Sequence, residues 1–129
     1  MDVLLDTHAV IWYVTKDSRL SKTSYEIIDD PANKCFISIA SLWEMGIKFS
    51  IGKLELNNDL QQIFEIIHRT GFEFLPISVN HVLSCAQLPF HHRDPFDRII
   101  IAQALTEKLS IITQDTHFRK YDVTVVWKK

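Results

Sequence analysis

The sequence predicts an α/β fold in which helices flank a mostly parallel central sheet of about five strands. Short apolar runs alternate with amphipathic segments along the whole chain, which is typical of strands and helices that stack in layers. The chain has 129 residues, of which 47% are hydrophobic and 23% charged, as in an ordinary globular domain. With three Gly, four Pro and no Ser-rich linker, residues 1–129 are expected to form a single domain.

The expected strands are short runs rich in Val, Ile, Leu or Phe, as strands covered on both faces require. In chain order they are residues 3–6, 35–38, 73–78, 110–114 and 123–127. The first run starts almost at once, with Val3, Leu4 and Leu5. The last run is expected at an edge of the sheet.

The expected helices are the amphipathic segments between and after these strands. They are residues 9–15, 22–30, 41–50, 60–70, 80–87 and 95–108. The clearest is 60–70, where Leu60, Ile63, Phe64 and Ile67 recur at helical spacing. Asp59 stands before this helix as a predicted N-cap, and Gly71 follows its end.

Charge and composition argue against several functional classes. Fourteen Lys and Arg face sixteen Asp and Glu, so no basic excess indicates a nucleic-acid partner. No secretory signal or long apolar stretch is visible, which predicts a cytoplasmic protein without a membrane partner. The three glycines are too scattered for a phosphate-binding loop. Cys35 and Cys85 are expected to be buried free thiols.

Acidic residues recur where a parallel sheet binds ligands, at the ends of strands and the starts of the helices that follow. Asp6 closes the first expected strand, and Asp115 follows the fourth. Glu44 lies near the start of the helix after the second strand, and Asp94 and Asp97 lie at the start of the last helix. Four separate elements are therefore expected to bring a carboxylate to one edge of the sheet.

Each of these acids also has a local structural explanation. Asp94 before Pro95 fits an N-cap, with Asp97 as the acid three residues on. Ser41 and Glu44 match a capping box, and the acids that close the first and fourth strands fit turn formers or N-caps. The joint pattern still favours a site, because gathered carboxylates repel one another unless they are protonated or neutralised by a cation.

Such a site suits one or two hard divalent cations, Mg²⁺ or Mn²⁺, which take oxygen ligands and are commonly held by carboxylates together with substrate phosphate. Because the chain has no phosphate-binding loop, the predicted chemistry is metal-assisted phosphoryl chemistry in which the ion holds the phosphate.

Four segments in the same order carry a family resemblance. They are Leu4-Leu5-Asp6-Thr7-His8, Ser41-Leu42-Trp43-Glu44, the stretch from His92 through Asp94-Pro95-Phe96-Asp97-Arg98 to Ala104, and Ile112-Thr113-Gln114-Asp115 with Phe118 after it. Together they resemble the PIN-domain ribonucleases and, within these, the VapC-type toxins of prokaryotic toxin–antitoxin pairs.

The resemblance implies a PIN-like three-layer fold and a catalytic quartet of acids, Asp6, Glu44, Asp97 and Asp115. These acids would bind the metal, and Asp94 would either join them as a ligand or only cap its helix. The resemblance also implies an RNA substrate, a cognate antitoxin protein that blocks the site, and a homodimer.

The resulting hypothesis is a metal-dependent endoribonuclease that hydrolyses RNA phosphodiester bonds. Candidate substrate-binding residues are Thr7 and Thr113, at strand ends, and Arg93 and Arg98, beside the acids, with Arg119 and Lys120 as further basic candidates. Helix capping and solvated surface charge are the alternatives for these residues.

The histidines and aromatic residues are expected to have simpler roles. His8 reads as a residue of the first helical turn, and His91 and His92 as loop residues that face solvent, since adjacent histidines project in different directions. The aromatic and apolar side chains of the first and third helices are expected to pack in the core or to meet the antitoxin; they are Trp12, Tyr13, Trp43, Phe49 and Ile51.

The alternative function is a catalytically silent PIN domain that serves as an RNA-binding or protein-interaction module. Loss of one of the four acids would mark it, and all four are present. A receiver domain needs an Asp after the third strand, but Pro76-Ile77-Ser78 holds no acid, so this class is disfavoured. A dehalogenase-type phosphatase needs an Asp two residues after Asp6, but position 8 is His, so this class is disfavoured too. If the five acids of the predicted site are neutralised by metal, eleven acids remain against fourteen basic residues, a balance compatible with RNA.

Overall fold

The computed structural model describes residues 1–54 and 59–128, and within them four parallel strands form one sheet. The strands are β1 (Asp2–Leu5), β2 (Lys34–Ser38), β3 (Glu73–Leu75) and β4 (Ser110–Ile112), side by side in the order β3-β2-β1-β4. Because all four run in the same direction, their carboxyl ends share one edge of the sheet. The predicted α/β class with a parallel sheet is confirmed.

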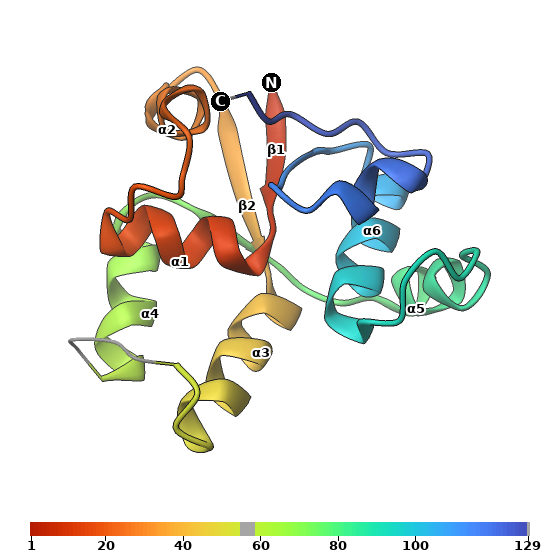
Figure 1. Ribbon diagram of the computed structural model, residues 1–129, viewed down its shortest axis with the longest axis horizontal. Coiled ribbons are helices and arrows are strands. Elements are labelled where there is room, and N and C mark those ends of the chain that lie inside the picture. The colour runs from red at the N-terminus through yellow and green to blue at the C-terminus, as the bar shows by residue number, and fades with distance from the viewer. Residues whose placement is uncertain (55–58, 129) are drawn as a thin grey trace.

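Helices cover both faces of this sheet (Figure 1). They are α1 (Thr7–Thr15), α2 (Lys22–Asp29), α3 (Ile39–Ser50), α4 (Leu60–Arg69), α5 (Val79–Ala86) and α6 (Pro95–Glu107), followed by the 3₁₀ helix η1 (Thr116–Lys120). In the view of Figure 1, α1, α2 and α4 lie to the left of β1 and β2, and α5 and α6 lie to the right. The chain thus forms the three layers that the sequence predicts.

Alternating side chains of β1 explain the layers. Val3 and Leu5 point into one hydrophobic cluster, which also holds residues of α1, α2 and α4. Leu4 points into the other cluster, with Ile100 and Ile101 of α6. The side chains of Val3, Leu4 and Leu5 are fully buried, as expected for the central part of a parallel sheet.

The prediction of a fifth strand at residues 123–127 is wrong. In residues 123–127, only Val125 forms a bridge, a parallel one to Ile111 of β4. Ile111 donates its N–H to the carbonyl of Thr124 and accepts one from Val126, each at 2.8 Å. No longer ladder forms along this edge of β4 in the described residues.

Several helices and strands begin or end at other residues than the sequence predicts. Ser38 caps α3 by accepting a hydrogen bond from Ala40 N–H, so α3 begins at Ile39 and not at Ser41. Asp6 caps α1, which begins at Thr7 and not at residue 9. β3 ends at Leu75 and not at residue 78, because Pro76 has no N–H to continue the ladder.

The predicted cap and end signal of α4 are confirmed. Asp59 forms a capping box with Gln62 at the start of α4, and Gly71 follows α4 with a positive φ of 95°. Cys35 is buried as expected, whereas Cys85 is only half-buried; both are free thiols. Within the part of the chain that the structure describes, no helix is long and apolar enough to cross a membrane.

Candidate active site

Asp6 stands where β1 ends and α1 begins, and only 4% of its surface is exposed. Its Oδ1 accepts the N–H of Ala9 at 2.8 Å, and its Oδ2 accepts a hydrogen bond from the hydroxyl of Thr113, just beyond β4. Burial raises the pKa of the Asp6 carboxyl above its usual range, although the hydrogen bonds act in the opposite direction. The ends of two neighbouring strands therefore hold one buried carboxyl.

Asp115 lies two residues beyond Thr113 and caps η1. Its N–H donates to Thr113 Oγ1 at 3.0 Å, and its Oδ1 accepts from the N–H and the Nδ1–H of His117, each at 2.9 Å. Partial burial opposes the ionisation of Asp115, but the hydrogen bonds from His117 outweigh it and lower the pKa. Asp115 is thus an ionised carboxylate at neutral pH.

Glu44 lies in the second turn of α3, since the helix begins at Ile39. The capping-box alternative for Ser41 and Glu44 is therefore wrong, and the Glu44 side chain is free for another role. Its Oε2 pairs with Lys48 Nζ at 2.9 Å. Its Oε1 is buried and has no hydrogen-bond partner among the described residues. A buried acceptor without a donor is costly, which points to a missing ligand at this oxygen.

Asp97 lies in the first turn of α6, and Asp94 is the N-cap of the same helix. Asp94 Oδ1 accepts from the N–H groups of Phe96 at 2.9 Å and of Asp97 at 3.2 Å, so its predicted capping role is present. The Asp97 side chain is only 19% exposed. Burial, and after it the negative charges of neighbouring acids, raise the pKa of Asp97 to about 8; these neighbours are Asp94, Asp6, Glu44 and Asp115.

The five predicted acids therefore share one site, which we call the acidic cluster: Asp6, Glu44, Asp94, Asp97 and Asp115. Asp6 follows β1, Glu44 lies in α3, and Asp115 follows β4; Asp94 and Asp97 lie at the start of α6. A cavity of about 490 Å³ opens beside the cluster; among the residues that line it are Asp6, Asp115, His8, Arg19 and His117.

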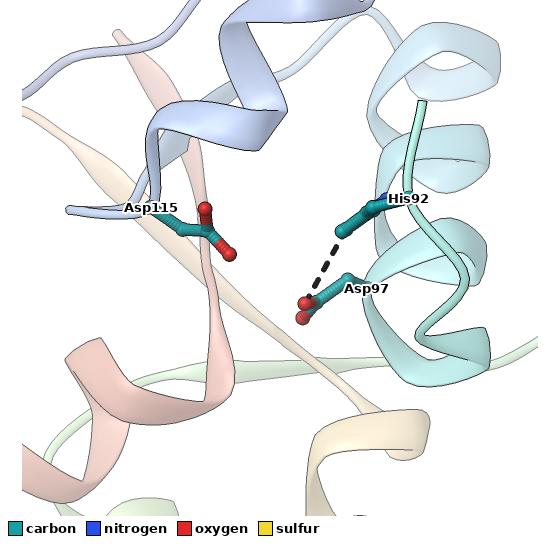
Figure 2. Close-up of side chains that lie close together, drawn as sticks. All are labelled: His92, Asp97 and Asp115. Atoms are coloured by element: carbon teal, nitrogen blue, oxygen red, sulfur yellow. Dashed lines mark ion pairs between the residues drawn. The ribbon is translucent and has the colours of Figure 1, made fainter. Parts of the chain in front are cut away.

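His92 is a residue of this site that sequence reasoning missed. It was expected to face solvent, but its side chain is only 11% exposed, and its Nε2 lies 3.5 Å from Asp97 Oδ2. Figure 2 shows His92, Asp97 and Asp115 turned toward one another from three separate segments. One potential ligand atom of each lies within 4.8 Å of the other two. The partners that bury the ring, Phe118 and Tyr121, are distant in sequence, so no local signal could reveal it.

Two predicted substrate-binding residues have other partners. Thr7 is 2% exposed and donates its hydroxyl to Ser41 Oγ at 2.9 Å, which joins α1 to α3. Arg98 is 6% exposed and donates to three carbonyls, so it does not face a substrate as expected; they belong to Cys85, Leu88 and Pro89. Thr113 supports Asp6, and Arg93 remains exposed at the start of α6.

The acidic cluster fits a divalent cation. All its donor atoms are carboxylate oxygens, which suit Mg²⁺ or Mn²⁺. Glu44 Oε1 is buried without a donor, and the negative charges of neighbouring acids add to burial in raising the pKa of Asp97; a bound cation would relieve both. Of these acids, Asp97 and Asp115 have potential ligand atoms within 4.8 Å of each other, and Asp6 and Glu44 lie near enough for their charges to act on Asp97.

Comparison with solved structures shows the same fold in other proteins. The chain is similar to VapBC2 from Rickettsia felis bound to a promoter DNA fragment, with a TM-score of 0.74, 16% identity and 98% of each chain covered. It is also similar to a toxin–antitoxin complex from Klebsiella pneumoniae, with a TM-score of 0.67, 24% identity and coverage of 97% of this chain and 96% of the other.

A third similar structure is FitAcB from Neisseria gonorrhoeae, with a TM-score of 0.65, 21% identity and 95% of each chain covered. A search of curated protein sequences gave no significant match. Comparison with protein families matches residues 3–123 to the PIN domain, which is most of the chain. The protein therefore belongs to the PIN domain family.

Proposed function

We propose that this protein is a metal-dependent endoribonuclease that hydrolyses RNA phosphodiester bonds. The observation that carries the proposal is the acidic cluster, in which burial and, after it, the charges of four neighbouring acids raise the pKa of Asp97 to about 8. A fold gains no stability from gathering like charges, so the arrangement is best explained by a bound cation. Membership of the PIN domain family supports the same function.

Asp6, Glu44, Asp97 and Asp115 would hold one or two Mg²⁺ or Mn²⁺ ions. When bound, the ion activates a water for in-line attack and stabilises the charge that develops on the phosphate. The residues of the chain contribute rigidity: Asp6 is fixed by Ala9 and Thr113, and Asp115 by His117. Fixed ligands keep the reacting groups in place and so lower the barrier.

Exposed basic residues next to the acidic cluster support a polyanionic substrate. Arg93 precedes α6, and Arg119 and Lys120 lie in η1, whose first residue follows Asp115. Their ammonium and guanidinium groups are suited to phosphates on either side of the cleaved bond. Arg98 is left out of this set because its guanidinium is buried.

We further propose that the protein is the VapC-type toxin of a toxin–antitoxin pair, acting in the cytoplasm. Similar structures are complexes of this kind. Exposed apolar side chains support protein partners: Trp43 of α3 is 63% exposed, and Val79 of α5 is 75% exposed. A cognate antitoxin and a second copy of the chain are the partners that we propose for these surfaces.

The decisive experiment is RNA cleavage with Mg²⁺ or Mn²⁺, in which wild type is compared with Asp6→Asn. Asn keeps the N-cap of α1 but removes the charge, so folding is preserved. Asp59→Asn is the matched control, because Asp59 is an N-cap of α4 outside the acidic cluster. We expect wild type and Asp59→Asn to cut RNA and Asp6→Asn to cut it much more slowly.

Two results would overturn this proposal. If wild type left a broad panel of RNAs uncut with either metal, the catalytically silent alternative would be favoured. If Asp6→Asn cut RNA as fast as wild type, the acidic cluster would not be the active site. Single-stranded DNA of matching sequence tests the specificity for RNA.

A further inference from the structure

The imidazole of His92 lies between a tyrosine hydroxyl and the acidic cluster. Its Nδ1 is 3.3 Å from the Tyr121 hydroxyl, and its Nε2 is 3.5 Å from Asp97 Oδ2 (Figure 2). The Nε2 atom is buried and has no hydrogen-bond partner in the described part of the chain. The role of His92 therefore depends on which ring nitrogen carries the proton.

The other hydrogen bonds of the Tyr121 hydroxyl indicate which ring nitrogen of His92 carries the proton. It accepts from the backbone N–H groups of His91 and His92 and from Nη1 of Arg98, each at 3.2 Å. Each of these nitrogens can only donate, so the oxygen is already occupied as an acceptor. Its own proton remains to be donated, and Nδ1 of His92 is the acceptor within reach. In the neutral ring, Nδ1 is thus an acceptor and the proton lies on Nε2.

This tautomer argues against His92 as a metal ligand, although its Nε2 lies near the carboxylates of Asp97 and Asp115. An imidazole that binds a metal through Nε2 carries its proton on Nδ1 and donates it to an acceptor. Here Nδ1–H would point at an oxygen that already receives three donors. The hydrogen-bond network therefore favours an N–H donor over a ligand at Nε2.

We propose that His92 is a positioning residue for Asp97: Tyr121 fixes it as the Nε2–H tautomer, and this N–H orients the Asp97 carboxylate. Oδ2 of Asp97 faces His92, which leaves Oδ1 for a cation. A shift of about 0.5 Å brings Nε2 and Oδ2 to ordinary hydrogen-bond distance. The effect of His92 on catalysis rests on the proposed nuclease function, whereas its tautomer does not.

The tautomer can be measured by long-range ¹H–¹⁵N NMR of the metal-free protein, at a pH above 8, where Asp97 is ionised and can accept the N–H. Two histidines of the same chain serve as references. His81 Nδ1 accepts the N–H of Ser78 at 2.9 Å, so His81 is an Nε2–H tautomer. His117 Nδ1 lies 2.9 Å from Asp115 Oδ1 and donates to it, so His117 is an Nδ1–H tautomer.

We expect the His92 signals, assigned from their loss in His92→Gln, to match those of His81. A match to His117 would overturn the proposal. Tyr121→Phe removes the hydroxyl, and we expect it to change the His92 pattern to a mixture of tautomers while His81 stays the same. Addition of Mg²⁺ is expected to keep the proton on Nε2. A switch to Nδ1–H on adding Mg²⁺ would identify a metal ligand and overturn the proposal.

RNA cleavage tests the effect on catalysis. We expect His92→Leu to lower kcat by about 10–100-fold with little change in KM, as for other residues that orient a metal ligand. His92→Gln restores an N–H donor near the position of Nε2 and should lose less. His91→Leu is the matched control, because His91 is the exposed neighbour that contacts the same tyrosine ring, and it should keep the wild-type kcat.

The two sets of measurements separate the two proposals. If wild type cuts no RNA, the proposed function fails, together with any catalytic effect of His92, while the NMR result still decides between donor and ligand. If wild type cuts RNA but His92→Leu is as fast as His91→Leu, the positioning role alone is overturned. Thermal unfolding of each variant shows whether a loss of kcat follows from misfolding.

Discussion

Thr113 donates its hydroxyl proton to Asp6 Oδ2 and accepts the N–H of Asp115 on the same oxygen. This single side chain therefore connects two members of the acidic cluster, one after β1 and one after β4. The neighbouring pairing of β1 with β4 makes the contact possible across 107 positions of sequence. Asp6 and Asp115 are oriented relative to each other by the sheet and by this hydroxyl.

Replacing Thr113 by Val tests this connection. Val has nearly the same shape but lacks the hydroxyl, so Asp6 loses a donor and Asp115 N–H loses an acceptor. We expect RNA cleavage by Thr113→Val to fall about 10–100-fold, the usual effect of removing a residue that orients a metal ligand. Thr113→Ser keeps the hydroxyl and should retain more activity than Thr113→Val. Equal rates for the two variants would contradict the proposed role.

The raised pKa of Asp97 predicts how stability depends on pH in the metal-free protein. In the native state the pKa is about 8, whereas an unfolded chain ionises Asp near about 3.9. Between these values the native state binds the proton more strongly, so the free energy of unfolding falls as pH rises. This contribution is fully present below about pH 4 and is lost as pH approaches and passes 8.

Asp97→Asn should remove that dependence. We expect the variant to gain about 1–3 kcal/mol over wild type at pH 8, and much less at pH 5, where Asp97 is already neutral in the native state. Urea denaturation with a chelator present measures both free energies. Asp59→Asn controls for the general effect of losing one acidic N-cap. A difference between Asp97→Asn and wild type that is the same at both pH values would show that Asp97 ionises normally.

The elements could be predicted from local pattern, but some boundaries could not. Ser41 and Glu44 match a capping box by sequence, yet Ser38 is the cap, because β2 pairs with β3 up to Ser38 and the helix starts directly afterwards. The pattern of residues 123–127 is apolar, but only Val125 pairs with β4. In both cases the outcome depends on neighbouring strands and not on the local sequence.

The acids of the site were predictable for a general reason, since parallel strands place their carboxyl ends together. The roles of the neighbouring His92 and Arg98 could not be predicted from the sequence. His92 and Arg98 are buried by contact with Tyr121, which lies more than twenty positions later in the chain. A charged residue is usually exposed, so the burial of Arg98 depends on carbonyls that only the folded chain between α5 and α6 provides.

Arg98 is expected to contribute to stability and not to substrate binding. Its guanidinium satisfies three backbone carbonyls and the Tyr121 hydroxyl, and it lies over the Phe90 ring at 4.2 Å. Arg98→Met should remove all of these hydrogen bonds and destabilise the protein by about 2–4 kcal/mol. The exposed Arg93→Met should change stability by less than about 0.5 kcal/mol.

Equilibrium denaturation in urea should show a loss of stability for Arg98→Met but not for Arg93→Met. RNA binding should be weakened by Arg93→Met but not by Arg98→Met. Arg93→Met should raise KM for RNA, because an exposed arginine beside the acidic cluster can contact phosphate. If both variants were equally stable, the buried hydrogen bonds of Arg98 would carry no net stabilisation.

Divalent cations should stabilise the native protein, because they neutralise the acidic cluster. With Mg²⁺ at about 100 times its dissociation constant, we expect the free energy of unfolding to rise by about 2.7 kcal/mol. Asp6→Asn and Glu44→Gln should weaken this effect, whereas Asp59→Asn should not. Thermal unfolding at constant ionic strength, with KCl in place of MgCl₂ as the reference, measures the specific part of the shift.

The affinity for Mg²⁺ should also rise with pH, since Asp97 must release its proton when it binds a cation and its pKa is about 8 without one. Calorimetric titration at pH 6 and pH 8, in buffers of different ionisation enthalpy, measures both the affinity and the number of protons released. We expect tighter binding at pH 8 and net proton release at pH 6, and we expect Asp97→Asn to lose both. Mg²⁺ binding that is independent of pH in the wild type would place the ion away from Asp97, because a carboxyl that stays protonated cannot be a strong ligand.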